Sequence, residues 1–263
     1  MQNFVLIVAV LLVLLAASGL GMYLRSVLRD RHKTADTFEH VRLVISILVT
    51  FTAIVLGLLI SEVKNSFDAF DSRLRAYAGD LAELDIRLRE YGPDAAPIRT
   101  ELRKYVAAAI ADTWRDEPAP PGLYPTYKDP AGIERAPLGE LLIAIDIAVH
   151  KLEPADNFHK RFAQSLEARM AATIQARRAL IESVHDTISW PLLVAMVTWL
   201  TIVFAVFGLI APRNAVVHGT IVLCALSFAS ALYFIVEFDG PVDGAIRVSS
   251  APMRDALRHI DAS

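Results

Sequence analysis

The sequence has very little cysteine and almost no excess charge, and both absences exclude classes of function. Its one cysteine, Cys224, lies inside an apolar run, so the chain can form no intrachain disulfide and no cysteine-based metal site. The formal net charge is −3, and no tract is rich in Lys and Arg, as a nucleic-acid-binding surface would require. We therefore expect no nucleic-acid partner.

The chain also lacks the short motifs that identify common enzyme classes. It has no phosphate-binding Gly-x-x-x-x-Gly-Lys-Ser/Thr loop, no Gly-x-Gly-x-x-Gly fingerprint and no Gly-x-Ser-x-Gly nucleophile elbow. Its seven histidines form no i,i+4 pair and no His-Glu-x-x-His motif. We expect no enzyme activity, no catalytic residue, no metal and no cofactor.

Apolar sequence is abundant. The hydrophobic fraction of 54% exceeds the roughly 45–50% of soluble domains. Four apolar runs carry no charge in their interior, and each approaches the ~20 residues that a membrane-spanning helix needs. In lipid only a helix satisfies its own backbone groups locally. The runs lie at about 4–24, 43–60, 190–210 and 216–238.

These runs predict an all-α, multi-pass protein of the cell (inner) membrane, with the lipid bilayer as its first partner. The predicted parts are a membrane helix pair (1–64), a helical extramembrane region (65–187), a second membrane pair (188–238) and a polar tail (239–263). A cleavable signal peptide is the alternative for the first run. That run is longer than a signal core, however, and no charged side chain precedes it.

Basic residues favour two different orientations. Five of them follow the first run and none precedes it, which places that loop in the cytoplasm and the large region outside. Counted near all membrane ends, nine basic residues lie on the side of the large region and six on the other. That total favours the large region inside, and both orientations stay open.

A heptad pattern begins in the second run and continues far beyond it. Residues 61–91 contain no proline and a single glycine, Gly79, and the helix-ending pair Gly92-Pro93 follows them. We therefore expect one continuous helix from the membrane to Tyr91. The stripe is the core face of a helical bundle or, alternatively, a contact between subunits. Its members are Ile60, Val63, Phe67, Phe70, Leu74, Tyr77, Leu81, Leu84, Leu88 and Tyr91.

Three further helices are predicted in the middle region. They cover about 95–114, 138–152 and a segment starting near Pro154, a residue suited to a first helical turn. Six prolines between 118 and 137 predict a loop or extended segment there.

Two membrane edges carry candidate polar sites. At the exit of the second run, Glu62 and Lys64 are either interfacial anchors or part of a polar ring at a pore mouth. In the loop between the last two runs, Arg213 is either held at lipid headgroups or presented to anions near a pore entrance.

The tail contains a third candidate site. Ser250 is a plausible N-cap for a short helix from Ala251, whose free amides would be flanked by Arg247 and Arg254. With Ser249 they could contact a phosphate or carboxylate. The alternative is helix capping with surface pairs between arginines and carboxylates.

Several stretches resemble the bestrophin-like family of bacterial membrane proteins. They are Leu-Gly-Leu-Leu-Ile-Ser-Glu-Val-Lys-Asn-Ser-Phe-Asp (56–68), Arg-Leu-Arg-Glu-Tyr-Gly-Pro (87–93), Phe-Gly-Leu-Ile-Ala-Pro-Arg-Asn (207–214) and the tail. The resemblance implies a distant relation to bestrophins, pentameric anion channels with four membrane helices per subunit. It also implies a homo-oligomer, an internal large region and an axis lined by the second helix. The lining candidates are Phe51, Thr52, Val55 and Leu59.

Two functions follow as hypotheses. The first is an oligomeric anion-permeable channel. The second is a non-conducting membrane scaffold or signalling protein organised by its heptad-bearing helix.

Overall fold

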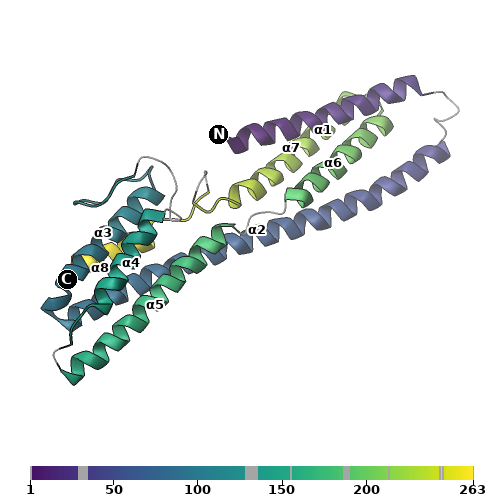
Figure 1. Ribbon diagram of the computed structural model, residues 1–263. Helices are drawn as coiled ribbons and strands as arrows, with labels where there is room; N and C mark the ends of the chain where they lie inside the picture. Colours follow the sequence, from purple (N-terminus) through teal and green to yellow (C-terminus); the bar gives the residue numbers. More distant parts are fainter. Residues whose placement is uncertain are drawn as a thin grey trace. The chain divides into compact units, whose positions relative to one another are not determined.

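Every regular element in the described part of the chain is helical. The computed structural model describes residues 2–28, 35–127, 136–154, 156–185, 190–212, 214–242, 244 and 246–262. The α-helices are α1 (Gln2–Val27), α2 (Ala35–Tyr91), α3 (Ala96–Thr113), α4 (Ala136–His150), α5 (Asn157–His185), α6 (Trp190–Ile210), α7 (Ala215–Phe238) and α8 (Ala251–Asp261), with a 3-10 turn at Pro93–Ala95 (Figure 1).

Four of these helices are long and apolar enough to cross a membrane. They are α1 (apolar over Phe4–Val27), α2, α6 and α7. The predicted runs at 190–210 and 216–238 match α6 and α7 to within one residue. The chain divides into two compact units, described in turn: unit 1 (1–67 and 187–240) and unit 2 (68–186 and 241–263). Helix α2 contributes to both.

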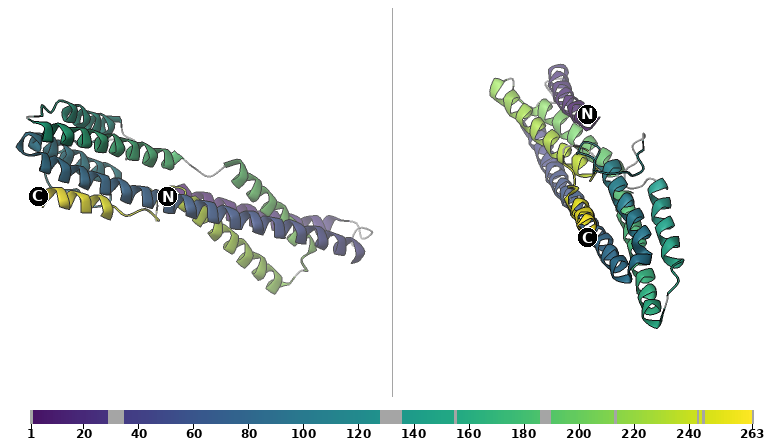
Figure 2. Two further views of the ribbon diagram at one scale, coloured as in Figure 1. Left: turned by 90° about the horizontal axis from the view of Figure 1, so that it is seen from below. Right: turned by 90° about the vertical axis from the view of Figure 1, so that its left-hand side faces the viewer.

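In unit 1, α1 packs along α6 and α7 (Figures 1 and 2). Two glycines let α1 and α6 approach closely. A Cβ atom on Gly21 would lie 1.9 Å from the carbonyl oxygen of Ala205, and one on Gly208 would lie 1.9 Å from that of Ser18. Since both obstacles are backbone, no side chain could move aside. Small residues at such crossings let membrane helices gain close packing, because lipid supplies no hydrophobic force between them.

Unit 2 is a helical bundle with a conventional buried core. Helix α3 packs against α4 and α8, and α4 packs against α5. The second half of α2 supplies the heptad stripe. From Phe70 to Tyr91 its stripe side chains are at most 5% exposed, and Leu74 and Leu81 are fully buried. From Phe70 onward the stripe is therefore the core face of this chain's own bundle, one of the two alternatives that its spacing left open, whereas Ile60 at its start is 42% exposed.

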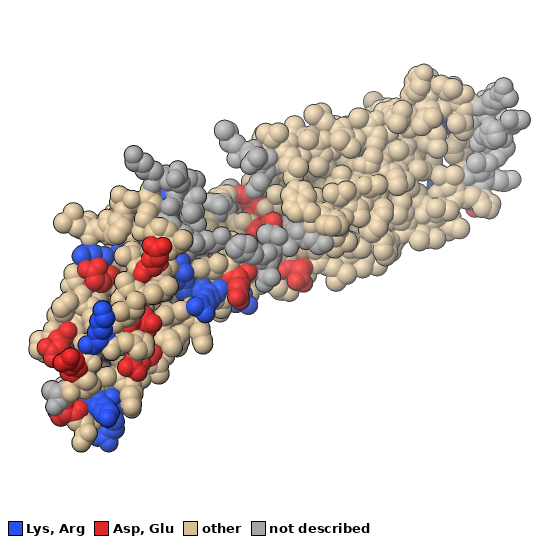
Figure 3. Space-filling view, viewed as in Figure 1, with Lys and Arg blue, Asp and Glu red and all other residues tan. Residues whose placement is uncertain are grey.

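Polar pairs join α2 to its neighbours within unit 2. The buried carboxylate of Asp85 accepts two hydrogen bonds from Arg99 of α3, at 2.8 and 3.0 Å. The hydroxyls of Tyr77 and Tyr105 lie 2.5 Å apart in the core. Figure 3 shows charged side chains gathered over unit 2, whereas the drawn face of unit 1 is almost wholly uncharged.

Several element boundaries match the prediction and one does not. Helix α2 is continuous to Tyr91 and ends at Gly92, whose φ of +112° lies in the region that favours glycine. Helix α5, however, begins at Asn157 and not near Pro154. The reason is Asp156, whose carboxylate accepts the backbone N–H of His159 at 2.8 Å and so starts the helix.

The prediction for Ser250 is correct in position but wrong in its hydrogen bond. Ser250 stands at the N-cap position of α8, but its side chain makes no capping hydrogen bond. Its hydroxyl donates to Glu117 and its oxygen accepts from Arg254 Nε at 2.8 Å, while the neighbouring Ser249 hydroxyl accepts the N–H of Ala251 at 3.1 Å. Hydrogen bonds to the charged groups of Glu117 and Arg254 are stronger than one to a backbone amide.

Candidate functional site

The first half of α2 presents one apolar face that the described residues of unit 1 leave largely exposed. Its side chains recur every three or four residues and are 49–66% exposed, and they are Leu43, Ile47, Phe51, Ile54 and Leu58. We call these five residues the α2 outer face. On the opposite side, Ile45, Thr52 and Leu59 are buried. Lipid or a second copy of the chain can contact the α2 outer face.

Two hydroxyls lie among these apolar side chains. Ser46 and Thr50 share a shallow depression of about 400 Å³ with four residues of the α2 outer face. The Ser46 hydroxyl donates to the backbone carbonyl of Arg42 at 2.7 Å, and the Thr50 hydroxyl donates to the backbone carbonyl of Ser46 at 2.9 Å. Each oxygen still has a free lone pair, so this part of the face could accept a hydrogen bond from water.

The four predicted lining residues divide between the two sides of α2. Phe51 belongs to the α2 outer face, where its ring makes an edge contact with Trp199 of α6 at 5.1 Å between centroids. Thr52 is 1% exposed and donates to Leu48 at 2.7 Å. Leu59 is a member of the unit 1 core, against which Val55 packs.

The sequence reasoning missed Ile47, Ile54 and Leu58. These residues recur every three or four positions after Leu43, so the sequence did indicate that they share one face of a helix. Because both faces of α2 are apolar in this stretch, the pattern could not indicate which one meets the other helices.

The predicted mouth residues are only partly described. Glu62 and Lys64 both have exposed side chains on α2. Arg213 lies outside the described residues. At the other end of α7, Glu237 is 3% exposed, a buried carboxylate that the sequence analysis did not select.

Arg25 ties together the ends of three helices in unit 1. Its guanidinium donates to the carbonyl of Ile210, the last residue of α6, at 2.9 Å, and to the carbonyl of Ala211, the residue after it. The same group lies 5.8 Å from the ring centroid of Phe38 near the start of α2. A cation at a helix C-terminus satisfies the orphan carbonyls and complements the helix dipole.

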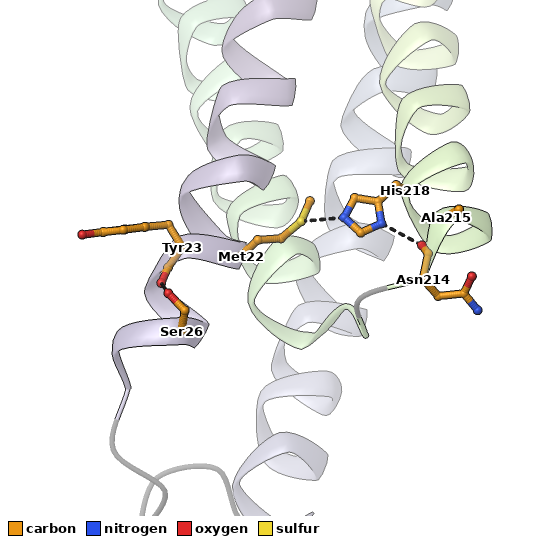
Figure 4. Close-up of a pocket in the computed structure, with 6 residues that line it drawn as sticks. All are labelled: Met22, Tyr23, Ser26, Asn214, Ala215 and His218. Carbon is orange, nitrogen blue, oxygen red and sulfur yellow. Dashed lines mark hydrogen bonds between the residues drawn. The ribbon is translucent and has the colours of Figure 1, made fainter.

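A shallow cavity of about 570 Å³ opens beside this contact (Figure 4). Helix α1 contributes Met22, Tyr23 and Ser26, and the start of α7 contributes Ala215 and His218 beside Asn214. Figure 4 shows the His218 ring and the Met22 thioether pointing toward one another, while the Tyr23 ring points away.

The tail residues of the third candidate site contact the segment that follows α3 within unit 2. Arg247 donates to Asp116 at 2.8 Å. Arg254 donates to Glu117 at 3.2 Å, to the Ser250 hydroxyl at 2.8 Å and to the carbonyl of Pro118 at 2.8 Å.

The backbone of the tail is held there as well. The buried indole of Trp114 donates to the carbonyl of Val248 at 2.9 Å. An anion or lipid headgroup at this place would compete with Asp116 and Glu117 for the arginines, and binding there stays a prediction.

Comparison with known proteins gives a family for this arrangement. Two point-substituted forms of a bacterial bestrophin homologue from Klebsiella pneumoniae superpose on the chain with a TM-score of 0.65 each, at 14% identity. The matches cover 97% and 99% of this chain and 98% and 97% of theirs. A further structure of the homologue from that organism superposes with a TM-score of 0.51 at 13% identity, over 97% of both chains.

None of the curated proteins compared matches this chain. The sequence model of the Bestrophin-like domain, by contrast, matches residues 10–253. At such low identity the solved structures establish a shared fold alone, but the sequence match extends over nearly the whole chain. This helical membrane protein therefore belongs to the Bestrophin-like family.

Proposed function

We propose that this protein is the subunit of a homo-oligomeric, anion-permeable channel in the cell (inner) membrane. The observation that carries the proposal is the α2 outer face, an apolar helix face with two hydroxyls that unit 1 leaves uncovered. Arranged around an axis, copies of this face would form a narrow apolar pore. Hydrophobic constrictions and rings of polar groups are elements from which channels build gates and selectivity.

The organisation that we propose has two membrane helix pairs, α1 with α2 and α6 with α7, and a helical region outside the membrane. Support comes from the four apolar helices and from the compact unit formed by residues 1–67 and 187–240. The pentameric state of bestrophins is our expectation for the oligomer.

The lining residues follow from the exposure of α2. We propose that Ile47, Phe51, Ile54 and Leu58 lie nearest the axis. Thr52 and Leu59 could reach it only if the helices of unit 1 separated, because both side chains are buried within one chain. Glu62, Lys64 and Arg213 are proposed for the mouths, where a ring of charge would set the preferred ion sign.

The alternative is a non-conducting scaffold or signalling protein. It requires only that residues 67–91 form a stable helix–helix seam, and the burial of the stripe residues from Phe70 to Tyr91, at most 5% exposed within one chain, is consistent with such a seam. If a scaffold joins subunits, it has to do so through another surface than these buried side chains.

The first test is chloride flux into liposomes containing the purified protein, after its native mass in mild detergent has been measured. In a Cys224→Ala background, we expect a charged thiol reagent to block flux through Ile54→Cys and Leu58→Cys. Thr52→Cys and Leu59→Cys should stay unmodified and serve as matched controls on the buried side of the same helix.

The outcomes separate the two functions. Flux that is blocked at the exposed positions only would support an axial α2 outer face, and Arg213→Glu should then change the ion preference. A monomer or dimer without flux, or flux insensitive to all four cysteines, would contradict the lining proposal.

A further inference from the structure

Met22 and His218 bring two metal-ligating atoms together from opposite ends of the sequence. Met22 lies in the second-last turn of α1 and His218 in the first turn of α7. The His218 Nε2 atom is 3.0 Å from the Met22 Sδ atom, in the cavity at this end of unit 1 (Figure 4).

The other ring nitrogen determines what Nε2 offers to the sulfur. His218 Nδ1 is 2.7 Å from the carbonyl oxygen of Asn214, and a carbonyl can only accept a hydrogen bond. Nδ1 must therefore carry the proton. In the neutral ring this leaves a lone pair on Nε2, directed at a thioether that also has only lone pairs to offer. Metal-ligating histidines use this arrangement, with the second nitrogen donating to a backbone carbonyl.

We propose that Met22 Sδ and His218 Nε2 bind a soft monovalent transition-metal ion, copper(I). A thioether selects soft ions such as copper(I), while imidazole binds copper as well as harder metals, so copper is the metal that suits both. A cation between the two atoms would replace the repulsion between their lone pairs with two bonds.

The surroundings agree with this assignment, and the distance does so once the methionine side chain moves. With bonds of about 2.0 and 2.3 Å, as in zinc sites, a separation of 3.0 Å corresponds to an angle of about 90° at the metal, and the flexible methionine can swing outward to open that angle for copper(I). None of the six lining residues carries a carboxylate, the ligand that magnesium, calcium and manganese prefer. Within the described residues, no three His, Cys, Asp or Glu side chains form a metal-binding group elsewhere.

Among the described residues the cavity is shallow and open. The Ser26 hydroxyl is turned to the Tyr23 carbonyl, to which it donates at 2.6 Å, and the Tyr23 ring points away from the cavity (Figure 4).

The test is anaerobic titration of the purified full-length protein with copper(I) against a coloured competing chelator. It is carried out in a Cys224→Ala background, because the free thiol would bind copper(I) by itself. We expect one copper(I) per chain. Met22→Leu and His218→Gln should each weaken copper(I) binding more than about 100-fold. Loss of a residue that only hydrogen-bonds a metal ligand already costs about 10–100-fold, and each of these variants removes a ligand itself.

Matched controls exist for both ligands. Met196→Leu changes a methionine buried in the same unit, and His259→Gln removes a histidine whose Nδ1 also lies within 2.8 Å of a carbonyl four residues earlier. Both controls should bind copper(I) as the parent does. Circular dichroism and thermal unfolding of every variant show whether the fold is intact.

The results decide the proposal in either direction. Stoichiometric binding that both ligand variants abolish, with intact folds, supports the site. Absence of binding in the parent, or binding that the two ligand variants leave unchanged, overturns it. Zinc binding of equal strength at the same two residues would contradict the soft-metal assignment.

Discussion

The two halves of α2 use similar apolar spacing for opposite purposes. In the first half Leu58 is 66% exposed, while in the second half Leu81 is fully buried. Leucines three or four residues apart form a stripe in both, but the first stripe belongs to a helix that can lie in lipid and the second to a bundle core. The comparison teaches that spacing identifies a face of a helix, whereas the surrounding medium decides whether that face must be covered.

The largest effect is expected where unit 1 depends on close backbone contact. Gly208→Ala would place a Cβ atom 1.9 Å from the Ser18 carbonyl oxygen and force α1 away from α6. We expect a loss of at least about 3 kcal/mol of stability, at the upper end for overpacking. Gly219→Ala on α7 meets no atom within 4 Å and is the control. Thermal unfolding in detergent compares them, and equal losses would contradict the tight crossing.

The next effect contrasts the two halves of α2 directly. Leu81→Ala removes a fully buried side chain from unit 2 and should cost about 2–5 kcal/mol. Leu58→Ala removes a side chain that its own chain barely covers, so the monomer should lose little stability. Denaturant unfolding monitored by circular dichroism measures both. A large loss for Leu58→Ala would indicate that this leucine is covered in the assembled protein.

A smaller effect is expected for the main ion pair of unit 2. Asp85→Asn leaves the Arg99 guanidinium without its charged partner, although the amide can still accept one hydrogen bond. We expect a loss of about 2 kcal/mol, because removing one side of a largely buried pair leaves an uncompensated charge. The exposed pair of Arg75 and Asp71 offers the comparison, since Asp71→Asn should cost clearly less stability in solvent that screens the pair. Similar losses for both pairs would be the contrary result.

The smallest effect appears only at alkaline pH. Burial raises the pKa of the Tyr105 phenol, although the positive charge of Arg177 opposes this rise. The folded state therefore holds that proton more firmly than the unfolded state does. The resulting stability is present below about pH 10, the usual value for tyrosine, and is lost as the pH rises through the folded-state pKa.

The Tyr77→Phe, Tyr105→Phe double variant removes the buried hydroxyls together, so neither is left unpaired. It should resemble the parent at pH 8 and lose less stability than the parent between pH 10 and 11. Unfolding temperatures at the two pH values measure the difference. Parallel losses in both proteins would show that this phenol does not contribute.

Much of the helical architecture was predictable from local sequence. Continuous apolar runs predicted α6 and α7 to within one residue, and Gly92 before a proline predicted the end of α2. The predicted start of α5 and the predicted capping hydrogen bond of Ser250 were wrong, because each depends on which hydrogen-bond partners a side chain takes. One partner of Ser250, Glu117, is 133 residues away.

The candidate site was predictable only in part. The second apolar run was predicted to line an axis, which stays a prediction, and Phe51 lies on its exposed face. Thr52 and Leu59 lie on the other side, which the uniform composition of the run concealed. His218 and Met22 are 196 residues apart, and neither belongs to a motif, so no local pattern could pair them.

The sequence by itself determined that this protein is helical, that four helices suit a membrane and which family it belongs to. These properties depend on local composition and on the need of each helix to satisfy its own backbone. Tertiary structure alone decided which face of α2 remains uncovered, that the heptad stripe closes a core within one chain, and that Met22 meets His218. Such features require distant segments to pack together, and packing depends on shape and space that no single stretch of sequence contains.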